Sequence, residues 1–183
     1  MSVKKFLLSF ILVLFAVSFA FAADDLSSWK KIIKDRTCVL WADAQLLDDI
    51  VLNARGNASI TWLPRALLRT FEKNKEADEW VVRGLNFYYS STNKKKLNGR
   101  DVVAINYKAV KTWNFNINNF KFGDYSVSSE DILSNKNEYI DGELNSGVQA
   151  IVYLAVPSKI FKHGKDLKIY LGDDSVILKL PKR

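Results

Sequence analysis

Apolar and polar residues alternate strictly in parts of the C-terminal half of the chain. Residues 113–118 read Trp-Asn-Phe-Asn-Ile-Asn, which places three large apolar side chains on one face of a strand and three asparagines on the other. Such a strand is typical of an antiparallel sheet that is covered on one side. Residues 151–156 form a nearly continuous apolar run, which predicts a central strand covered on both faces.

Short runs of the same kind predict strands along most of the chain. Gly84 interrupts the alternation of residues 79–91 and predicts a bulge there, and Asn98-Gly99 predicts a hairpin turn within a loop over residues 92–100. The strands are expected at residues 37–41, 59–63, 79–91, 102–110, 119–127, 167–171 and 175–180, with residues 65–71 extending the second of these after Pro64. Many short strands separated by turn signals predict an all-β fold, mainly an antiparallel β-sandwich of immunoglobulin-like type.

A short helix is expected at the start of the mature chain. Asp25 is a suitable N-cap, and Trp29, Ile32 and Ile33 follow at helical spacing. The chain is thus expected to be all-β with a short N-terminal helix.

The residues before this helix have the pattern of a secretory signal peptide. Lys4 and Lys5 precede an apolar run over residues 6–21, and Ala20-Phe21-Ala22 supplies small residues for cleavage after Ala22. The alternative is a membrane anchor, but a spanning helix needs about 20 apolar residues. We therefore expect a periplasmic or secreted protein without a transmembrane anchor after signal removal, with residues 1–22 as the signal peptide.

The remainder is expected to form a single β-rich domain over residues 23–183. Strands and a helix occupy residues 23–100, and the sandwich core occupies residues 101–183. The full chain of 183 residues is 48% hydrophobic and 13% aromatic, which is enough to form a sizeable core. Its net charge is +7, and removing Lys4 and Lys5 lowers it by two, so the mature protein is mildly basic.

One stretch resembles a known family. A strand ends in asparagine at residues 115–119, and Gly142-Glu143-Leu144-Asn145-Ser146-Gly147 follows after a loop. Then come an apolar strand that ends at Val156-Pro157 and a final strand pair. Residues 101–180 thus resemble the telokin-like, immunoglobulin-type domains of exported bacterial proteins, although these usually carry proline where this chain has Ser146. The resemblance implies a binding or adaptor module without enzymatic activity.

Residue types that carry most enzymatic chemistry are scarce. His163 is the only histidine and Cys38 the only cysteine, so a catalytic triad or a typical zinc site lacks its components. We expect no catalytic residues, no metal site and no cofactor. Cys38 lies in an apolar run, which favours a buried thiol over a reactive or intermolecular one. Asn57-Ala58-Ser59 matches the N-glycosylation pattern, and its use is left open.

Adjacent carboxylates offer one catalytic alternative. The pairs are Asp48-Asp49, Glu130-Asp131 and Asp173-Asp174. Two carboxylates that converge in one cleft can act as acid and base in a hydrolase. None of these pairs has the alternating spacing of a calcium loop, and solvated turns explain them more simply.

The most concentrated charge lies in a loop rich in lysine. Lys94, Lys95, Lys96 and Arg100 surround Asn98-Gly99, and Tyr88 lies close by in the sequence. These residues predict a site for an anionic glycan or lipid, although lysines near strand edges also serve to prevent aggregation. We expect no nucleic-acid partner.

Together these features predict an exported, non-enzymatic interaction module of the cell envelope or extracellular space. Its partner is expected to be another exported protein or an envelope component. The alternative is binding of an anionic glycan or lipid through residues 94–100.

Overall fold

The structure is a computed structural model that describes residues 29–47, 50–72 and 77–182. The chain divides into two compact units, residues 1–34 and residues 35–183. In the first unit, residues 29–34 are helical, which confirms the short N-terminal helix. The expected signal peptide, its cleavage site after Ala22 and the Asp25 cap lie outside the described residues, as does the Asp48-Asp49 pair.

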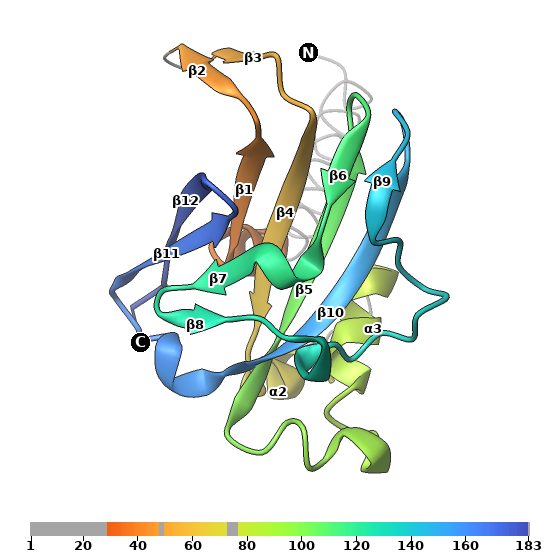
Figure 1. The fold of residues 1–183 in the computed structure, drawn as a ribbon. Coiled ribbons are helices and arrows are strands. Elements are labelled where there is room, and N and C mark those ends of the chain that lie inside the picture. Colours follow the sequence, from red (N-terminus) through yellow and green to blue (C-terminus); the bar gives the residue numbers. More distant parts are fainter. Residues whose placement is uncertain (1–28, 48–49, 73–76, 183) are drawn as a thin grey trace, which may run out of the picture. The chain divides into compact units, whose positions relative to one another are not determined.

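Four antiparallel strands form the larger sheet of the second unit (Figure 1). In spatial order they are β1 (Thr37–Ala42), β4 (Gly56–Leu63), β5 (Arg100–Ala109) and β10 (Gln149–Pro157). Ile60 lies opposite Ile105, and Ile105 lies opposite Val152. Directly paired residues point to the same face, so the three side chains form one buried row across the sheet.

A second sheet lies in front of the larger one in Figure 1. Its strands, in spatial order, are β12 (Asp174–Lys179), β11 (Asp166–Leu171), β7 (Phe120–Phe122) and β8 (Tyr125–Ser126). Two short antiparallel ribbons complete the strands: β2 (Gln45–Leu47) with β3 (Ile50–Leu52), and β6 (Trp113–Phe115) with β9 (Gly142–Leu144).

A continuous apolar core fills the space between the sheets. The rings of Tyr107 and Phe115 stack with centroids 4.0 Å apart, and those of Trp62 and Phe161 stack at 5.0 Å. Such aromatic pairs add to the burial term that dominates sheet packing. The predicted mainly antiparallel β-sandwich is therefore confirmed.

The side chains of the alternating stretch at residues 113–118 are buried and exposed in the predicted pattern. Its Trp, Phe and Ile side chains are buried, and its three asparagines are exposed. The strand itself ends at Phe115, because the Asn116 side chain accepts a hydrogen bond from the Asn118 N–H at 2.9 Å and starts a 3₁₀ turn over Ile117–Asn119.

Two helices, not strands, follow β4. They are α2 (Leu67–Phe71) and α3 (Glu79–Asn86), so the predicted strand at residues 79–91 and the extension at residues 65–71 are wrong. In α3, Val81 and Leu85 lie one helical turn apart and are both fully buried. Gly84 is no bulge; a Cβ there would lie 2.6 Å from Leu63 Cδ1. Packing against the sheet therefore determines that residues 79–86 are helical, which their short alternating pattern did not indicate.

The stretch at residues 92–100 is not a hairpin loop between two strands. It leads from α3 through the 3₁₀ turn Ser91–Asn93 into β5, and Gly99 adopts a positive φ of 66°, which glycine adopts without strain. Residues 119–127 form two strands, β7 and β8, because Gly123, at φ 57°, reverses the chain between them.

The apolar run in β10 is covered on both faces as predicted, with residues 152–156 all buried. It is not central: β10 lies at one end of the larger sheet, and the two inner strands are β4 and β5. A single bridge from Ile132 to Leu154 covers part of its outer edge. The structure confirms the strands expected at residues 37–41 and 59–63 and the final hairpin β11–β12.

Within the described ranges, no helix has the length and apolar character that a membrane span requires.

Candidate functional site

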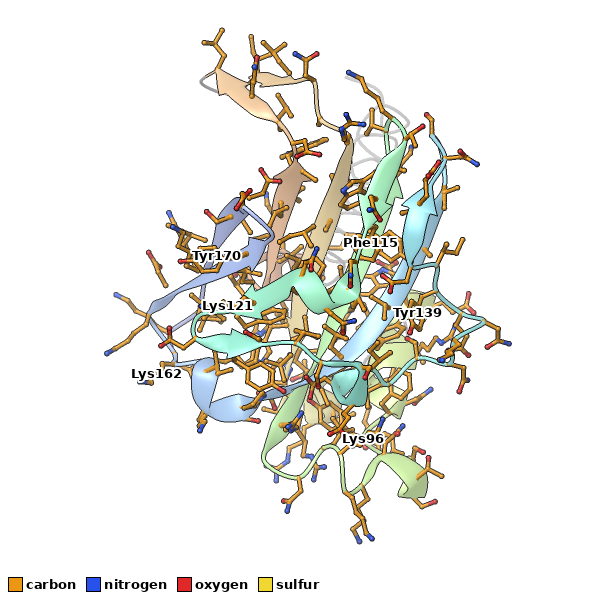
Figure 2. All side chains as sticks on the ribbon, in the orientation of Figure 1. Lys96, Phe115, Lys121, Tyr139, Lys162 and Tyr170 are labelled. Carbon is orange, nitrogen blue, oxygen red and sulfur yellow. The ribbon has the colours of Figure 1, made fainter. Side chains whose placement is uncertain are left out.

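A basic depression lies at the beginning of β5, where the connection from α3 enters the larger sheet. Its volume is about 730 Å³. The residues that line it are Arg65, Ser91, Lys94, Lys95, Leu97, Asn98, Gly99, Arg100, Asp101 and Ser158. In Figure 2, side chains that end in nitrogen gather near the labelled Lys96, at the lower end of the view.

Lys94 and Lys95, two of the ligand contacts expected from the sequence, both line this depression. Both are exposed and follow the 3₁₀ turn Ser91–Asn93. Leu97 is only 2% exposed and its N–H donates to the Asn93 carbonyl at 2.9 Å. This buried leucine anchors the connection, so the lysines before it point outward from a fixed turn.

Arg65 supplies a third charge that sequence reasoning did not include. It follows Pro64 at the end of β4, and its Cζ lies 5.2 Å from the centroid of the Tyr88 ring. The end of β4 pairs with the start of β5, with Leu63 opposite Val102. This register brings Arg65 to the loop, and a local charge pattern carries no signal of it.

Lys96 does not line the depression. Its Nζ donates to the carbonyl of Ile132 at 3.1 Å. Its side chain therefore reaches toward the segment that covers β10, and Lys96 is a matched control for the two lysines before it.

Arg100 lines the depression, but its charge is already compensated. Its Nη1 pairs with Asp131 Oδ1, donates to the Ala155 carbonyl at 3.1 Å and lies 3.3 Å from the Tyr125 hydroxyl. The Asp131 side chain is only 3% exposed, and the Ser128 N–H also donates to it at 2.9 Å. The predicted ligand contact is thus mainly an anchor between β5, β10 and the 3₁₀ turn Ser129–Asp131.

Tyr88 does not line the depression and is likewise a packing residue. Its hydroxyl donates to the Leu63 carbonyl at 2.7 Å and accepts from the Val102 N–H at 2.8 Å. Burial raises the pKa of Tyr88, and the neighbouring Asp101 charge raises it further. The hydroxyl therefore stays protonated and bridges the last pair of the β4–β5 ladder.

One carboxylate lies among these cations. Asp101 is 8% exposed and lines the depression. Its Oδ2 accepts a hydrogen bond from Trp62 Nε1 at 3.0 Å. Ser91, Asn98 and Ser158 add hydroxyl and amide groups, so the depression offers several cations, one anion and neutral donors.

None of the described residues considered for catalysis lines this depression. His163 is exposed, with Nδ1 3.2 Å from the Pro181 carbonyl oxygen. Asp174 Oδ2 accepts the Asp43 N–H at 2.9 Å, and Glu130 is exposed while Asp131 is held by Arg100. Among the described residues, no three His, Cys, Asp or Glu side chains gather to hold a metal ion.

A second depression, of about 360 Å³, contains two carboxylates. Glu79 and Glu138 line it together with Arg83, whose Nη2 lies 2.6 Å from Glu138 Oε1. Desolvation by itself would raise the pKa of Glu138, but hydrogen bonds from Asn135 and the Arg83 charge outweigh it and lower the pKa. Glu138 is therefore held ionised, which does not suit a general acid.

An apolar face is exposed on the ribbon β2–β3. Leu47 lies opposite Ile50, and Leu52 lies opposite Gln45, so all four side chains point to the same face. The exposed fractions of the three aliphatic residues are 62% for Leu47, 57% for Ile50 and 42% for Leu52. Exposed aliphatic groups that share one face are typical of a contact surface.

The chain was compared with family models, curated proteins and solved structures, and none of them matches it.

Proposed function

We propose that this chain is an exported, non-enzymatic binding module of the cell envelope or extracellular space that binds an anionic ligand, a glycan or a lipid head group, in the basic depression. The observation that carries this proposal is the convergence of Arg65, Lys94 and Lys95 on one concave surface. The resemblance of residues 101–180 to telokin-like domains also supports a binding role, because it implies a binding or adaptor module.

The three cations are available to a ligand. None of them forms an ion pair with an acidic residue that the structure describes, whereas Arg100 is paired with Asp131. Opposite charges on a ligand would be attracted at each of these groups, and Arg65 can engage a carboxylate, sulfate or phosphate with two parallel hydrogen bonds. Ser91 and Ser158 would add neutral contacts to hydroxyl-rich ligands.

The test replaces Arg65, Lys94 and Lys95 by glutamine and measures binding to heparin and to vesicles that contain phosphatidylglycerol. We expect the triple variant to lose most of its affinity and most of the salt dependence of that affinity. Each contact between a cationic side chain and an anionic group releases a counter-ion on binding, and the substitutions remove three such contacts. A matched variant with the same charge loss at the exposed Lys108, Lys111 and Lys179 controls for net charge.

Lys96→Gln supplies a closer control, because this lysine is adjacent in sequence but contacts Ile132. Equal losses in the triple variant and the matched control would mean that binding depends on net charge alone, and the depression would not be the site.

A second candidate function is binding of a protein partner through the apolar face of β2–β3. Its support is the alignment of Leu47, Ile50 and Leu52 on one face. An isolated two-stranded ribbon is marginally stable in water, and a partner that covers this face would stabilise it.

This candidate is tested by capture from envelope extract at high salt, where charge contacts are screened. Leu47→Ser with Ile50→Ser is expected to abolish capture, while Ile177→Ser, which removes an aliphatic side chain that is 51% exposed on β12, is expected to leave it intact. Capture that survives the double substitution would exclude this face.

A further inference from the structure

The lining of the basic depression includes a carboxylate, Asp101, whose charge has no cationic partner among the described residues. Asp101 lies next to Arg100 in β5, but the Arg100 guanidinium is directed to Asp131, Ala155 and Tyr125. No ion pair joins Asp101 to a described lysine or arginine. A carboxylate that is 8% exposed and lacks a cationic partner is unfavourable by itself.

The position of this carboxylate is fixed by its surroundings. Trp62 Nε1 donates to Asp101 Oδ2 at 3.0 Å, and the Trp62 ring is itself held by stacking on Phe161. An ionised carboxylate has about four acceptor positions on its two oxygens, and the indole N–H occupies one of them. Asp101 therefore retains acceptor capacity within a depression that it lines.

The groups around Asp101 are mainly cationic. Arg65, Lys94 and Lys95 line the same depression and pair with no described acidic residue. A ligand that carried only negative charge would be attracted by these cations and repelled by Asp101. A ligand that also carried an ammonium group would satisfy both charges.

We infer that the depression takes a zwitterionic ester of the phosphoethanolamine type, with its phosphate among Arg65, Lys94 and Lys95 and its ammonium group on Asp101. This inference rests on the proposed function, because it names the chemical class of the anionic ligand. A phosphate accepts hydrogen bonds at several oxygens, which suits three separate cations. An ammonium group donates up to three hydrogen bonds, which suits a carboxylate with unused acceptor positions.

The test compares two ligands that differ only in the ammonium group, O-phosphoethanolamine and ethyl phosphate. Calorimetry or NMR titration of the mature chain is expected to give tighter binding of phosphoethanolamine. Asp101→Asn retains an oxygen that can accept the Trp62 N–H but removes the charge. The variant is expected to bind phosphoethanolamine about fivefold more weakly and ethyl phosphate about fivefold more tightly, because one unit charge at short range has an effect of this order.

The expected changes in affinity for phosphoethanolamine and for ethyl phosphate have opposite signs, which a general loss of structure would not produce. Asp173→Asn, which removes an exposed carboxylate in the β11–β12 turn, is expected to change neither affinity. The comparison of the two ligands on the unsubstituted chain needs no variant, so it remains decisive if Asp101→Asn fails to fold.

Several outcomes overturn the inference. If the chain binds ethyl phosphate as tightly as phosphoethanolamine, and Lys94→Gln with Lys95→Gln abolishes both, the anion site stands and the zwitterionic preference is wrong. If Asp101→Asn raises the affinity for both ligands equally, Asp101 only repels the phosphate group and does not bind the ammonium group. If neither ligand binds, this inference fails, and the anion-site proposal stands or falls on heparin and the vesicles that contain phosphatidylglycerol.

A third comparison distinguishes the source of the head group. Vesicles that contain phosphatidylethanolamine in phosphatidylcholine present it on a bilayer, and O-phosphoethanolamine presents it free in solution. Capture on the vesicles identifies a lipid, and binding of the soluble compound alone identifies a phosphoethanolamine group borne by a soluble or glycan ligand. Either result supports the same recognition chemistry.

Discussion

Arg100 and Asp131 are 31 positions apart in the sequence, and their side chains form an ion pair at the edge of the basic depression. The pair joins the first residue of β5 to the 3₁₀ turn Ser129–Asp131. Arg100 also donates to the Ala155 carbonyl of β10 at 3.1 Å. A residue that belongs to the most basic stretch of the sequence therefore serves to hold three segments together.

Replacing Asp131 by asparagine tests this anchoring role. We expect a loss of about 2 kcal/mol in the free energy of unfolding at neutral pH, because the Arg100 guanidinium and the Ser128 N–H lose a nearly buried, charged acceptor. Urea denaturation followed by tryptophan fluorescence measures the change. Glu130→Gln, which alters the exposed neighbour, is the control, and an equal loss in both variants would contradict the assignment.

The same pair predicts a dependence of stability on acid. Burial by itself would raise the pKa of Asp131, but hydrogen bonds from Tyr125, Ser128 and Arg100 outweigh it and lower the pKa. The stabilisation is therefore fully present above the ordinary aspartate pKa of about 4 and is lost as pH falls through the lowered value of the folded state. The stability difference between the unsubstituted chain and Asp131→Asn should shrink below about pH 4; a difference that is constant with pH would argue against this cause.

Tyr88→Phe tests the hydroxyl that bridges Leu63 and Val102. Both backbone groups are fully buried, so removing the hydroxyl leaves a carbonyl and an N–H without this partner, and we expect a loss of about 2 kcal/mol. The ring remains beneath Arg65, so ligand affinity in the depression should change little. Tyr89→Phe is the control because its hydroxyl contacts Glu72 on the surface; equal losses of stability would show that the bridge is unimportant.

Cys38 should behave as an inert thiol. It is 9% exposed in β1, and burial raises its pKa to about 12. Thiol reagents react with the thiolate, so labelling at pH 8 should be very slow in the folded protein and complete in urea. Rapid stoichiometric labelling of the folded chain would contradict the burial and favour a reactive cysteine.

Gly56→Ala should destabilise the sandwich. A Cβ at this position would lie 2.3 Å from Trp113 Cε3 and within 2.8 Å of two further ring atoms. The Trp113 ring is 5% exposed and has little room to move, so we expect a loss of about 1–3 kcal/mol. Ser59→Ala in the same strand should have a smaller effect, and thermal unfolding of the two variants makes the comparison.

Sequence reasoning failed where a short pattern fitted two periods. In α3, Val81 and Leu85 are buried because they face the sheet from one side of a helix, yet the residues around them also alternate at a period of two. The close approach of Gly84 to Leu63 and Tyr153 distinguishes the two cases. This contact joins segments that are far apart in the sequence.

The sequence by itself determined the sandwich class and the buried face of residues 113–118. The apolar positions at 113, 115 and 117 are buried as the alternation predicted, because a period of two can satisfy only a strand with one covered face. It also identified Lys94 and Lys95 as candidate ligand contacts. These properties depend on local spacing and side-chain chemistry, which the sequence contains directly.

The tertiary structure decided which charges share a site. Pairing of Leu63 with Val102 brings Arg65 to the loop. Arg100 instead forms an ion pair with Asp131, and Lys96 donates a hydrogen bond to the Ile132 carbonyl. Asp101 lines the same depression, and its Oδ2 accepts a hydrogen bond from Trp62, which is 39 positions away. Such long-range contacts depend on strand register and on burial, and a local pattern of charged residues carries no information about either.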